Sequence, residues 1–143
     1  MKIAMASDHG GLDLKNRVKQ YIEECGHQVV DFGTYTADSC DYPDFARPCA
    51  EAVANGSCER GIVVCTTGIG VSIVANKVKG VRCALCTNSD LATMTRRHNN
   101  ANVLAMGQRY VDFDTAKQIV NAFLSTPFDG GRHQRRVDKI ETL

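Results

Sequence analysis

The chain has 143 residues and a mass of 15.6 kDa, which is the size of one domain rather than two. Its 17 Lys and Arg residues almost balance its 16 Asp and Glu residues, and this near-neutral charge argues against a nucleic-acid or membrane-surface partner. No apolar run exceeds four residues, whereas a membrane-spanning helix needs about 20. An acidic residue already stands at position 8, which leaves no room for a secretory signal, so we expect a cytoplasmic protein.

Strand-like and helix-like segments alternate along the chain. Short apolar runs that end at glycines or polar turns predict five strands, over residues 3–6, 29–32, 62–65, 83–86 and 103–106. Apolar stripes at helical spacing predict helices between them, from Leu14 to Cys25, around Ala46 to Val53, around Ile73, from Leu91 to His98 and from Ala116 to Phe123. Asp112 can cap the last of these. After Gly130 and Gly131, an amphipathic segment predicts a helical tail at about residues 132–142.

This alternation predicts the fold class. Strands that alternate with helices form βαβ units, and such units build a parallel sheet that is covered on both faces. We therefore expect a single domain over residues 1–143, with a three-layer α/β/α, doubly wound (Rossmann-like) fold and a mainly parallel sheet of about five strands. Open sheets of this kind bind ligands beyond the carboxyl ends of their strands, so we expect the functional side chains in the loops that follow them.

Seven cysteines are many for this length, and in a protein without a secretory signal they are expected to be free thiols that mostly pack in the core. Cys83 and Cys86 form the one close pair, but residues three apart on a strand point to opposite faces. No second pair has the spacing of zinc ligands, so we expect no metal site.

The sharpest candidate for chemistry is the segment 65–70, in which the Cys65 thiol stands where an apolar strand turns into a helix. Backbone N–H groups and the helix dipole favour negative charge there, so they could stabilise a thiolate and a developing oxyanion. The alternative is a core cysteine at the end of a strand, beside glycines that serve only the turn. A dinucleotide site is disfavoured, because Ile73 stands where the G-x-G-x-x-G pattern needs its third glycine.

Two histidines lie at further positions suited to chemistry. His9 follows the first strand together with Asp8, although Asp8 could simply cap a helix beside a surface histidine. His98 closes the fourth predicted helix, where a histidine could equally just complement the helix dipole.

The arginines of the tail favour an anionic ligand. Arg132 and Arg136 are four residues apart, so a helical tail would aim both guanidinium groups in one direction, as a phosphate dianion requires. Arg109, after the fifth strand, could be a third such group. A phosphorylated substrate, a thiolate base and an acid/base histidine fit proton transfer beside a carbonyl, without a metal or redox cofactor.

Eight short motifs stand in the order and spacing of one known family, and they are Ser7–Gly11, Asp41–Pro43, Cys65–Gly70, Ala75–Lys77, Arg97–Asn99, Asn102–Val103, Gly107–Arg109 and Gly130–Val137. In these motifs the whole chain resembles the ribose-5-phosphate isomerases of type B, whose family also contains galactose-6-phosphate and allose-6-phosphate isomerases. The resemblance implies an isomerase that interconverts ribose 5-phosphate and ribulose 5-phosphate through an enediolate, in the non-oxidative branch of the pentose phosphate pathway, with no cofactor.

The resemblance also implies roles for single residues. Cys65 would be the base that takes a proton from C2 and returns it to C1, and Thr67 with the N–H groups of its loop would hold the enediolate. His98 would open the furanose ring, helped by Asp8 at the hydroxyl groups. The residues implied in substrate binding are Asp8, His9, Tyr42, Thr66, Thr67, Gly68, Ile69, Gly70 and Asn99, and those implied in phosphate binding are His9, Arg109, Arg132 and Arg136.

Members of this family form homodimers or dimers of dimers that share active sites between subunits. We therefore expect His98, Asn99 and Arg109 to reach Cys65 from another subunit. The usual family loop is Cys-Gly-Thr-Gly, and here Thr66 replaces the first glycine, so either this position needs no positive φ or the loop is reshaped.

Three alternatives remain beside ribose 5-phosphate isomerisation. Allose 6-phosphate differs from the pentose by one CH–OH unit, which asks only for a slightly longer pocket. Galactose 6-phosphate fits less well, because in those relatives the thiol loop and the arginine tail look divided between two chains, and this chain carries both. A non-catalytic module that binds a sugar phosphate would use the same fold, although it would not need the thiol.

Overall fold

A five-stranded parallel sheet forms the centre of the protein, in a computed structural model that describes residues 1–143. Every strand pairing is parallel, and the strand order is β2-β1-β3-β5-β4. The strands are β1 (Lys2–Ser7), β2 (Gln28–Asp31), β3 (Arg60–Cys65), β4 (Cys83–Leu85) and β5 (Val103–Gly107). The five predicted strands are thus confirmed, with ends within two residues of those expected.

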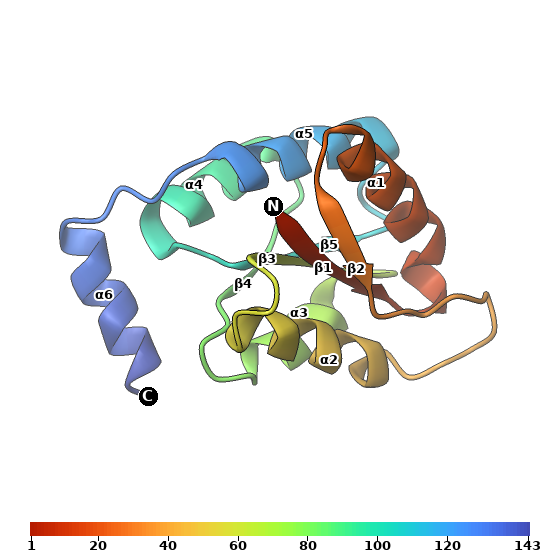
Figure 1. Ribbon diagram of the computed structural model, residues 1–143, viewed down its shortest axis with the longest axis horizontal. Coiled ribbons are helices and arrows are strands. Elements are labelled where there is room, and N and C mark those ends of the chain that lie inside the picture. Colours follow the sequence, from red (N-terminus) through yellow and green to blue (C-terminus); the bar gives the residue numbers. More distant parts are fainter.

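Helices cover both faces of this sheet, as the doubly wound prediction requires. They are α1 (Leu12–Glu24), α2 (Pro43–Ala54), α3 (Ile69–Asn76), α4 (Ser89–Asn99), α5 (Phe113–Ser125) and α6 (Arg132–Glu141), with one 3-10 turn, η1 (His9–Gly11). Helices α1, α4 and α5 pack together over one face, and α2 and α3 lie over the other (Figure 1). Helix α6 stands apart, beside the end of α4. None of these helices has both the length and the apolar character needed to cross a membrane.

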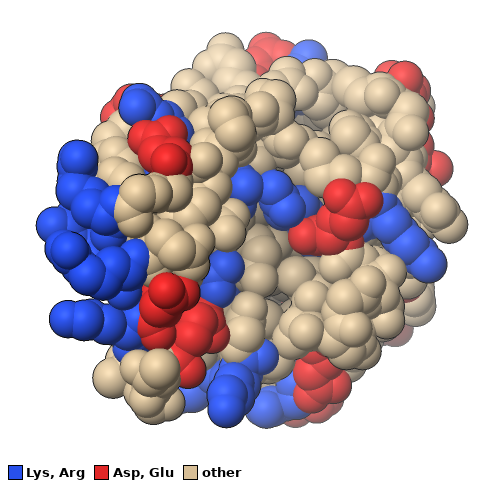
Figure 2. All heavy atoms as spheres, turned by 60° about the vertical axis from the view of Figure 1, so that its left-hand side comes forward, with Lys and Arg blue, Asp and Glu red and all other residues tan.

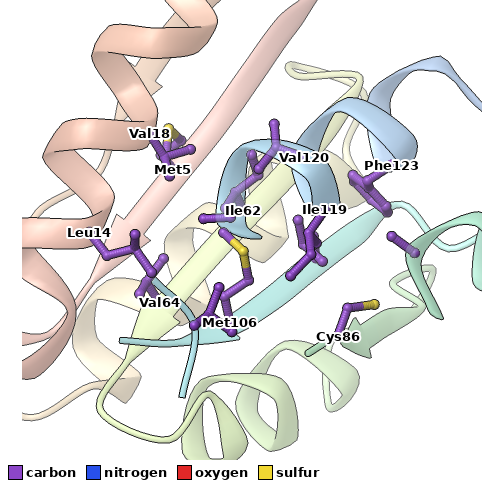
Figure 3. Packing of buried hydrophobic residues seen from close by; sticks show 14 of the residues in the cluster. Met5, Leu14, Val18, Ile62, Val64, Cys86, Met106, Ile119, Val120 and Phe123 are labelled. Carbon is purple, nitrogen blue, oxygen red and sulfur yellow. The ribbon is translucent and has the colours of Figure 1, made fainter. Parts of the chain in front are cut away.

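The side chains of each strand alternate between two hydrophobic clusters, one on each face of the sheet. Met5, Ile62 and Met106 point to the face covered by α1, α4 and α5, where large side chains fill the space (Figure 3). Ala6 and Ala105 point to the other face, and such small residues let α2 and α3 approach the sheet closely. Since both faces of β1, β3 and β5 are buried, these strands have near-continuous apolar sequences.

All seven cysteines are free thiols, as predicted. Cys83 packs against one hydrophobic cluster and Cys86 belongs to the other, so the close pair does point to opposite faces. Burial raises the pKa of Cys86 to about 11 and raises the pKa of Cys49 and of Cys83 further, which keeps these three thiols protonated at neutral pH.

The strand order determines which loops meet at the carboxyl edge of the sheet. Strand β3 is central, with β1 on one side and β5 on the other. The chain leaves β1 toward β2 and then crosses back to β3, so a crevice opens between the carboxyl ends of β1 and β3. Cys65 is paired with Gly107 at that edge, which brings the loop after β5 directly beside the thiol loop.

Candidate active site

The Cys65 thiol lies at the carboxyl end of β3 and is 5% exposed. Gly68 donates its backbone N–H to the Cys65 sulfur over 3.1 Å. Gly68 has φ +79° and any Cβ there would meet the backbone of Met106 at 2.8 Å, so this turn needs glycine. A backbone donor aimed at the sulfur stabilises its thiolate form.

Further unpaired donors stand beside this thiol at the start of α3. The N–H groups of Gly70 and Val71 have no acceptor within the protein, as the first turn of a helix leaves them free. Thr67 Oγ1 accepts the N–H of Ile69 over 3.2 Å, which fixes the hydroxyl at the same turn. These donors can hold a negatively charged oxygen near the sulfur.

Asp8 and His9 border the same crevice from the end of β1. Asp8 is 8% exposed, and its Oδ1 accepts the N–H of Gly11 over 3.1 Å, so it does cap η1. His9 is exposed, and its Nδ1 accepts the backbone N–H of Cys40 over 3.3 Å. In its neutral form His9 therefore carries its proton on Nε2, which stays available as a donor. The contact with Cys40 had no signal in the sequence, because it joins loops 31 residues apart.

Tyr42 and Thr66 complete this part of the crevice. A Cβ on Gly70 would lie 2.8 Å from the Tyr42 ring, so the ring packs directly on the thiol loop. A Cβ on Gly10 would lie 2.1 Å from Thr66 Oγ1, so the threonine hydroxyl occupies space that only a glycine leaves open. Asn100 is the sole non-glycine residue with positive φ, so Thr66 needs no such conformation and the loop accepts a β-branched residue there.

Arg109 lies on the same side of the molecule as this thiol loop. Its backbone N–H donates to the carbonyl of Thr66 over 3.0 Å, and its side chain is exposed. The backbone of Arg109 thus lies beside the thiol loop of its own chain, and the expectation that its side chain reaches Cys65 of another subunit stays a prediction. The strand order explains this contact, because β5 lies next to β3 instead of at the edge of the sheet.

His98 and Asn99 lie at the opposite edge of the sheet. Helix α4 starts after the carboxyl end of β4 and ends just before β5 begins, so its last turn lies at the amino edge. Cys65 pairs with Gly107 at the far end of β5, four strand residues or roughly 13 Å beyond Val103. One chain therefore does not bring His98 to its own Cys65.

The His98 ring stacks on His133 of α6, with ring centroids 4.4 Å apart and 12° between the planes. His133 is 9% exposed, and burial lowers its pKa, as do the neighbouring charges of His98 and Arg132. Asn99 is exposed, and its Oδ1 accepts the hydroxyl of Thr95 over 3.1 Å. The candidate ring-opening histidine thus belongs to a cluster formed by α4 and α6.

Arg132 and Arg136 share one helix, as predicted, since α6 begins at Arg132. Both are exposed and neither forms an ion pair, because the acids of the tail are engaged elsewhere. Asp129 is paired with Arg97, and Asp138 accepts a hydrogen bond from Gln134. Lys and Arg side chains gather on the side of the molecule where α6 lies (Figure 2). Unpaired guanidinium groups in such a patch attract a phosphate.

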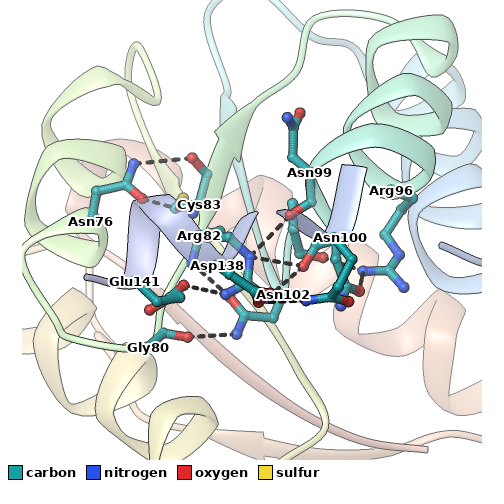
Figure 4. Close-up of polar contacts among 12 residues, drawn as sticks. Asn76, Gly80, Arg82, Cys83, Arg96, Asn99, Asn100, Asn102, Asp138 and Glu141 are labelled. Atoms are coloured by element: carbon teal, nitrogen blue, oxygen red, sulfur yellow. Dashed lines mark hydrogen bonds and ion pairs between the residues drawn. The ribbon is translucent and has the colours of Figure 1, made fainter. Parts of the chain in front are cut away.

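Two arginines that sequence reasoning missed hold the end of α4 in place. Arg82 donates to the carbonyls of Asn99 and Asn100, each over 2.9 Å, and also pairs with Glu141 of α6 (Figure 4). Arg96 is 3% exposed and donates to the carbonyl of Ala101 over 2.6 Å and to that of Thr126 over 3.2 Å. No sequence pattern distinguishes these arginines from surface ones, because most of their acceptors are backbone carbonyls.

The asparagines of two motifs prove to be structural as well. Asn76 exchanges hydrogen bonds with the backbone N–H and carbonyl of Cys83, and so fixes the short strand β4 to α3 (Figure 4). Asn102 accepts the N–H of Arg82 over 2.8 Å and donates to the carbonyl of Gly80 over 2.9 Å. Both side chains replace backbone partners at the irregular entry to β4.

An exposed apolar surface extends from the thiol loop to the end of α4. Ile69 and Ile73 of α3 are 52% and 56% exposed, and Leu85 of the edge strand is 37% exposed. A hollow of about 340 Å³ continues this surface, and its lining residues are Ala84, Leu85, Cys86, Leu91, Met94, Thr95, His98 and Asn99. Apolar side chains in this arrangement are suited to contact another protein surface.

Comparison with known proteins identifies the family of this chain. A model of the ribose/galactose isomerase family matches residues 3–140. The chain is 44% identical to ribose-5-phosphate isomerase B of Escherichia coli, over 99% of this chain and 95% of the relative.

Solved structures of similar proteins agree with that match. The structure of ribose-5-phosphate isomerase B from Clostridium thermocellum superposes with a TM-score of 0.98 at 53% identity, covering 99% of this chain and 96% of that one. The Mycoplasma genitalium isomerase B, solved with bound ribulose 5-phosphate, superposes with a TM-score of 0.95 at 45% identity, covering 99% and 94% of the two chains.

Proposed function

The chain belongs to the ribose/galactose isomerase family, and from this we propose that it is an isomerase that interconverts ribose 5-phosphate and ribulose 5-phosphate through an enediolate, with Cys65 as the base. The observation that carries the assignment of the base is the buried thiol at the end of β3, which accepts the Gly68 N–H over 3.1 Å beside unpaired donors. The other cysteines of the core lack such donors and have raised pKa values where burial is strongest.

The proton transfer follows from these positions. In the open-chain aldose, the Cys65 thiolate takes the proton from C2, and the electron pair of that C–H bond forms the C1–C2 double bond while the charge moves to O1. The same thiol then returns its proton to C1, the O2 hydroxyl loses its proton to O1, and a ketone forms at C2. The free N–H groups of Gly70 and Val71 and the Thr67 hydroxyl stabilise the enediolate oxygens between the two steps.

The candidate residues that bind the phosphate and the hydroxyl groups of the substrate lie at both edges of the sheet. His9 and Arg109 lie at the carboxyl edge with Cys65, whereas Arg132 and Arg136 lie with His98 and the amino edge. A substrate that touches all of them bridges two chains, so we place each active site between the thiol loop of one protomer and the α4–α6 end of its partner. The exposed apolar surface on α3, β4 and α4 supplies the contact between such copies.

In this arrangement His98 opens the furanose ring, by taking the proton of the anomeric hydroxyl and giving one to the ring oxygen. Asp8 and Tyr42 of the first chain and Asn99 of the second then contact the sugar hydroxyls. We place the reaction in the cytoplasm, in the non-oxidative branch of the pentose phosphate pathway, where seven free thiols stay reduced.

The first test is ketose formation from ribose 5-phosphate, with a chelator present and no cofactor added. Allose 6-phosphate and galactose 6-phosphate are run in parallel. We expect turnover of the pentose with the highest kcat/KM of the three. Faster turnover of a hexose phosphate would identify that sugar as the preferred substrate. Binding of ribose 5-phosphate without turnover of any of the three would identify a binding module.

The second test addresses the shared site by mixing two inactive variants, Cys65→Ala and His98→Gln. If each site takes Cys65 from one chain and His98 from the other, a mixed dimer has one site with both changes and one intact site. Random assortment should then restore about one quarter of the wild-type activity, since half of the dimers are mixed. A mixture that stays inactive after subunit exchange would show that each site is built from one chain.

A further inference from the structure

A cluster of three metal-ligating side chains lies outside the thiol loop. His98 at the end of α4, Asp129 in the segment before α6 and His133 in the first turn of α6 each offer one ligand atom, and these atoms all lie within 4.8 Å of one another. We propose that this cluster binds a divalent transition metal of the zinc class, and that the bound metal inhibits the enzyme by occupying the His98 imidazole. The inhibition rests on the proposed function, because it requires His98 to act on the sugar.

The donor set is the first argument for such a site. Two imidazole nitrogens and one carboxylate oxygen are ligands that Zn²⁺ takes in proteins, at about 2.0–2.2 Å each. Around a tetrahedral ion such atoms are roughly 3.3 Å apart, so the three side chains need to approach by about 1.5 Å at most. Since the two rings stack, at least one must turn about its Cβ–Cγ bond to aim its nitrogen at the shared ion.

The local backbone favours this approach. The N–H of Asp129 donates to the carbonyl of Arg97 over 3.1 Å, which holds the carboxylate beside the last turn of α4. Gly130 and Gly131 separate Asp129 from α6, and both have positive φ with open space around them. The segment can therefore adjust, while its start stays fixed next to His98.

Neighbouring charges set the strength of this site. Arg97 pairs with Asp129 at 3.1 Å, so a metal ion must share or replace that partner. Arg132 and Arg136 also stand on the same end of the molecule and repel a cation. Both effects predict binding that is reversible and that a strong chelator removes. The spacing of the cysteines predicted no metal site, and these ligands escape that pattern because they are two histidines and a carboxylate, 31 and 4 residues apart.

Cobalt titration of the purified full-length protein tests the site directly, since Co²⁺ reports its ligands through its visible absorption. We expect one bound Co²⁺ per chain, bound by nitrogen and oxygen ligands without the charge-transfer band of a thiolate, and displaced by Zn²⁺. Asp129→Asn and His133→Asn should each weaken binding at least about tenfold. Asp138→Asn is the matched control in the same tail. Cys40→Ser is a second control, since the exposed Cys40 thiol lies beside the His9 imidazole, and this variant should bind Co²⁺ as the wild type does.

The inhibition is measured separately, as isomerase activity against added Zn²⁺. We expect activity to fall with metal occupancy, to return with excess chelator, and to become resistant to Zn²⁺ in Asp129→Asn but not in Asp138→Asn. Failure to bind Co²⁺, a thiolate band, or unchanged binding in Asp129→Asn would overturn the site. Full activity at saturating metal would overturn the inhibition. An inactive metal-free protein would instead count against the proposed function, and the cobalt titration would still decide the site.

Discussion

The two halves of the candidate active site are built in different ways. The thiol half lies on the loops after β1, β3 and β5, and backbone contacts such as Gly68 to Cys65 fix its geometry. The histidine half lies on the last turn of α4 and on α6, where arginine side chains clamp the backbone. The first half is part of the folded core, whereas the second is an exposed edge, which in our proposal forms a site with another copy of the chain.

Substitutions in the two halves should therefore have different effects on activity and stability. Changing the reacting side chain of the thiol half, Cys65, should alter chemistry while leaving the fold intact, because backbone and core support it from all sides. Changing an arginine of the histidine half should alter local order or substrate affinity, because fewer contacts hold this half.

The largest effect is expected from Cys65→Ala, which removes the base. General-base groups contribute roughly 10²–10⁴-fold to rate, so kcat should fall by about three orders of magnitude. Phosphate contacts are unchanged, so the dissociation constant for ribose 5-phosphate should stay within a few-fold of that of the wild type. Steady-state kinetics and calorimetric titration measure the two quantities.

Cys58→Ala is the matched control, since Cys58 is a buried cysteine that packs on the same face of the sheet away from the crevice. Its kcat should be close to that of the wild type. Activity in Cys65→Ala comparable with that of Cys58→Ala would remove the thiol from the mechanism.

The buried cations of the two halves give the next contrast, in stability. Lys15 is fully buried and donates to Asp31 over 2.8 Å and to the carbonyl of Thr34 over 2.6 Å, at the start of the loop that leads to Tyr42. Lys15→Met leaves the Asp31 carboxylate with the Gly33 N–H and, as its only cation, the more distant Lys19, so the free energy of unfolding should fall by about 3 kcal/mol. Chemical denaturation measures this loss.

Arg96→Met is the counterpart in the histidine half. It leaves the carbonyls of Ala101 and Thr126 without donors, at a cost of about 2 kcal/mol. Amide hydrogen exchange should then increase at the end of α4 but not at the thiol loop. An equal increase in exchange at the end of α4 and at the thiol loop would show that the histidine half is locally no less stable than the thiol half.

Substrate affinity should respond next, through Arg136→Ala. Hydrogen bonds to charged groups contribute about 1.5–3 kcal/mol, so KM for ribose 5-phosphate should rise about tenfold or more, with a smaller change in kcat. Arg135→Ala is the control, because Arg135 is exposed on the same helix one position away. Equal KM values for the two variants would exclude Arg136 from the phosphate site.

The same contrast separates what the sequence could predict from what it could not. The strands, the helices and the thiol loop were predictable, since apolar periodicity and glycine positions are local patterns. The place of β5 between β3 and β4 was not, because the apolar runs carry no information on strand order. The contact between Arg109 and Thr66 therefore had no signal in the sequence.

The residues that hold the histidine half in place could not be predicted from the sequence either. Arg82 and Arg96 bind backbone carbonyls, and any carbonyl has the same chemistry whatever its residue type. Lys15 is a fully buried lysine, against the usual preference of its type, and only the fold shows that Asp31 lies beside it. Long-range side-chain contacts of this kind arise from the folded chain, and periodicity does not record them.

The smallest effect concerns Thr66, where this chain departs from the usual family loop. The residue has no positive φ, so Thr66→Gly should cost the loop only about 0.5–1 kcal/mol of backbone entropy and change kcat/KM by a few-fold. Gly10→Ala should be worse, because its Cβ would meet Thr66 Oγ1 at 2.1 Å. In the double variant that collision is absent, so part of the activity lost in Gly10→Ala should return. A coupling free energy of about 1 kcal/mol in kcat/KM is expected for residues in such contact, and additive effects would show that the Thr66 hydroxyl leaves Gly10 unconstrained.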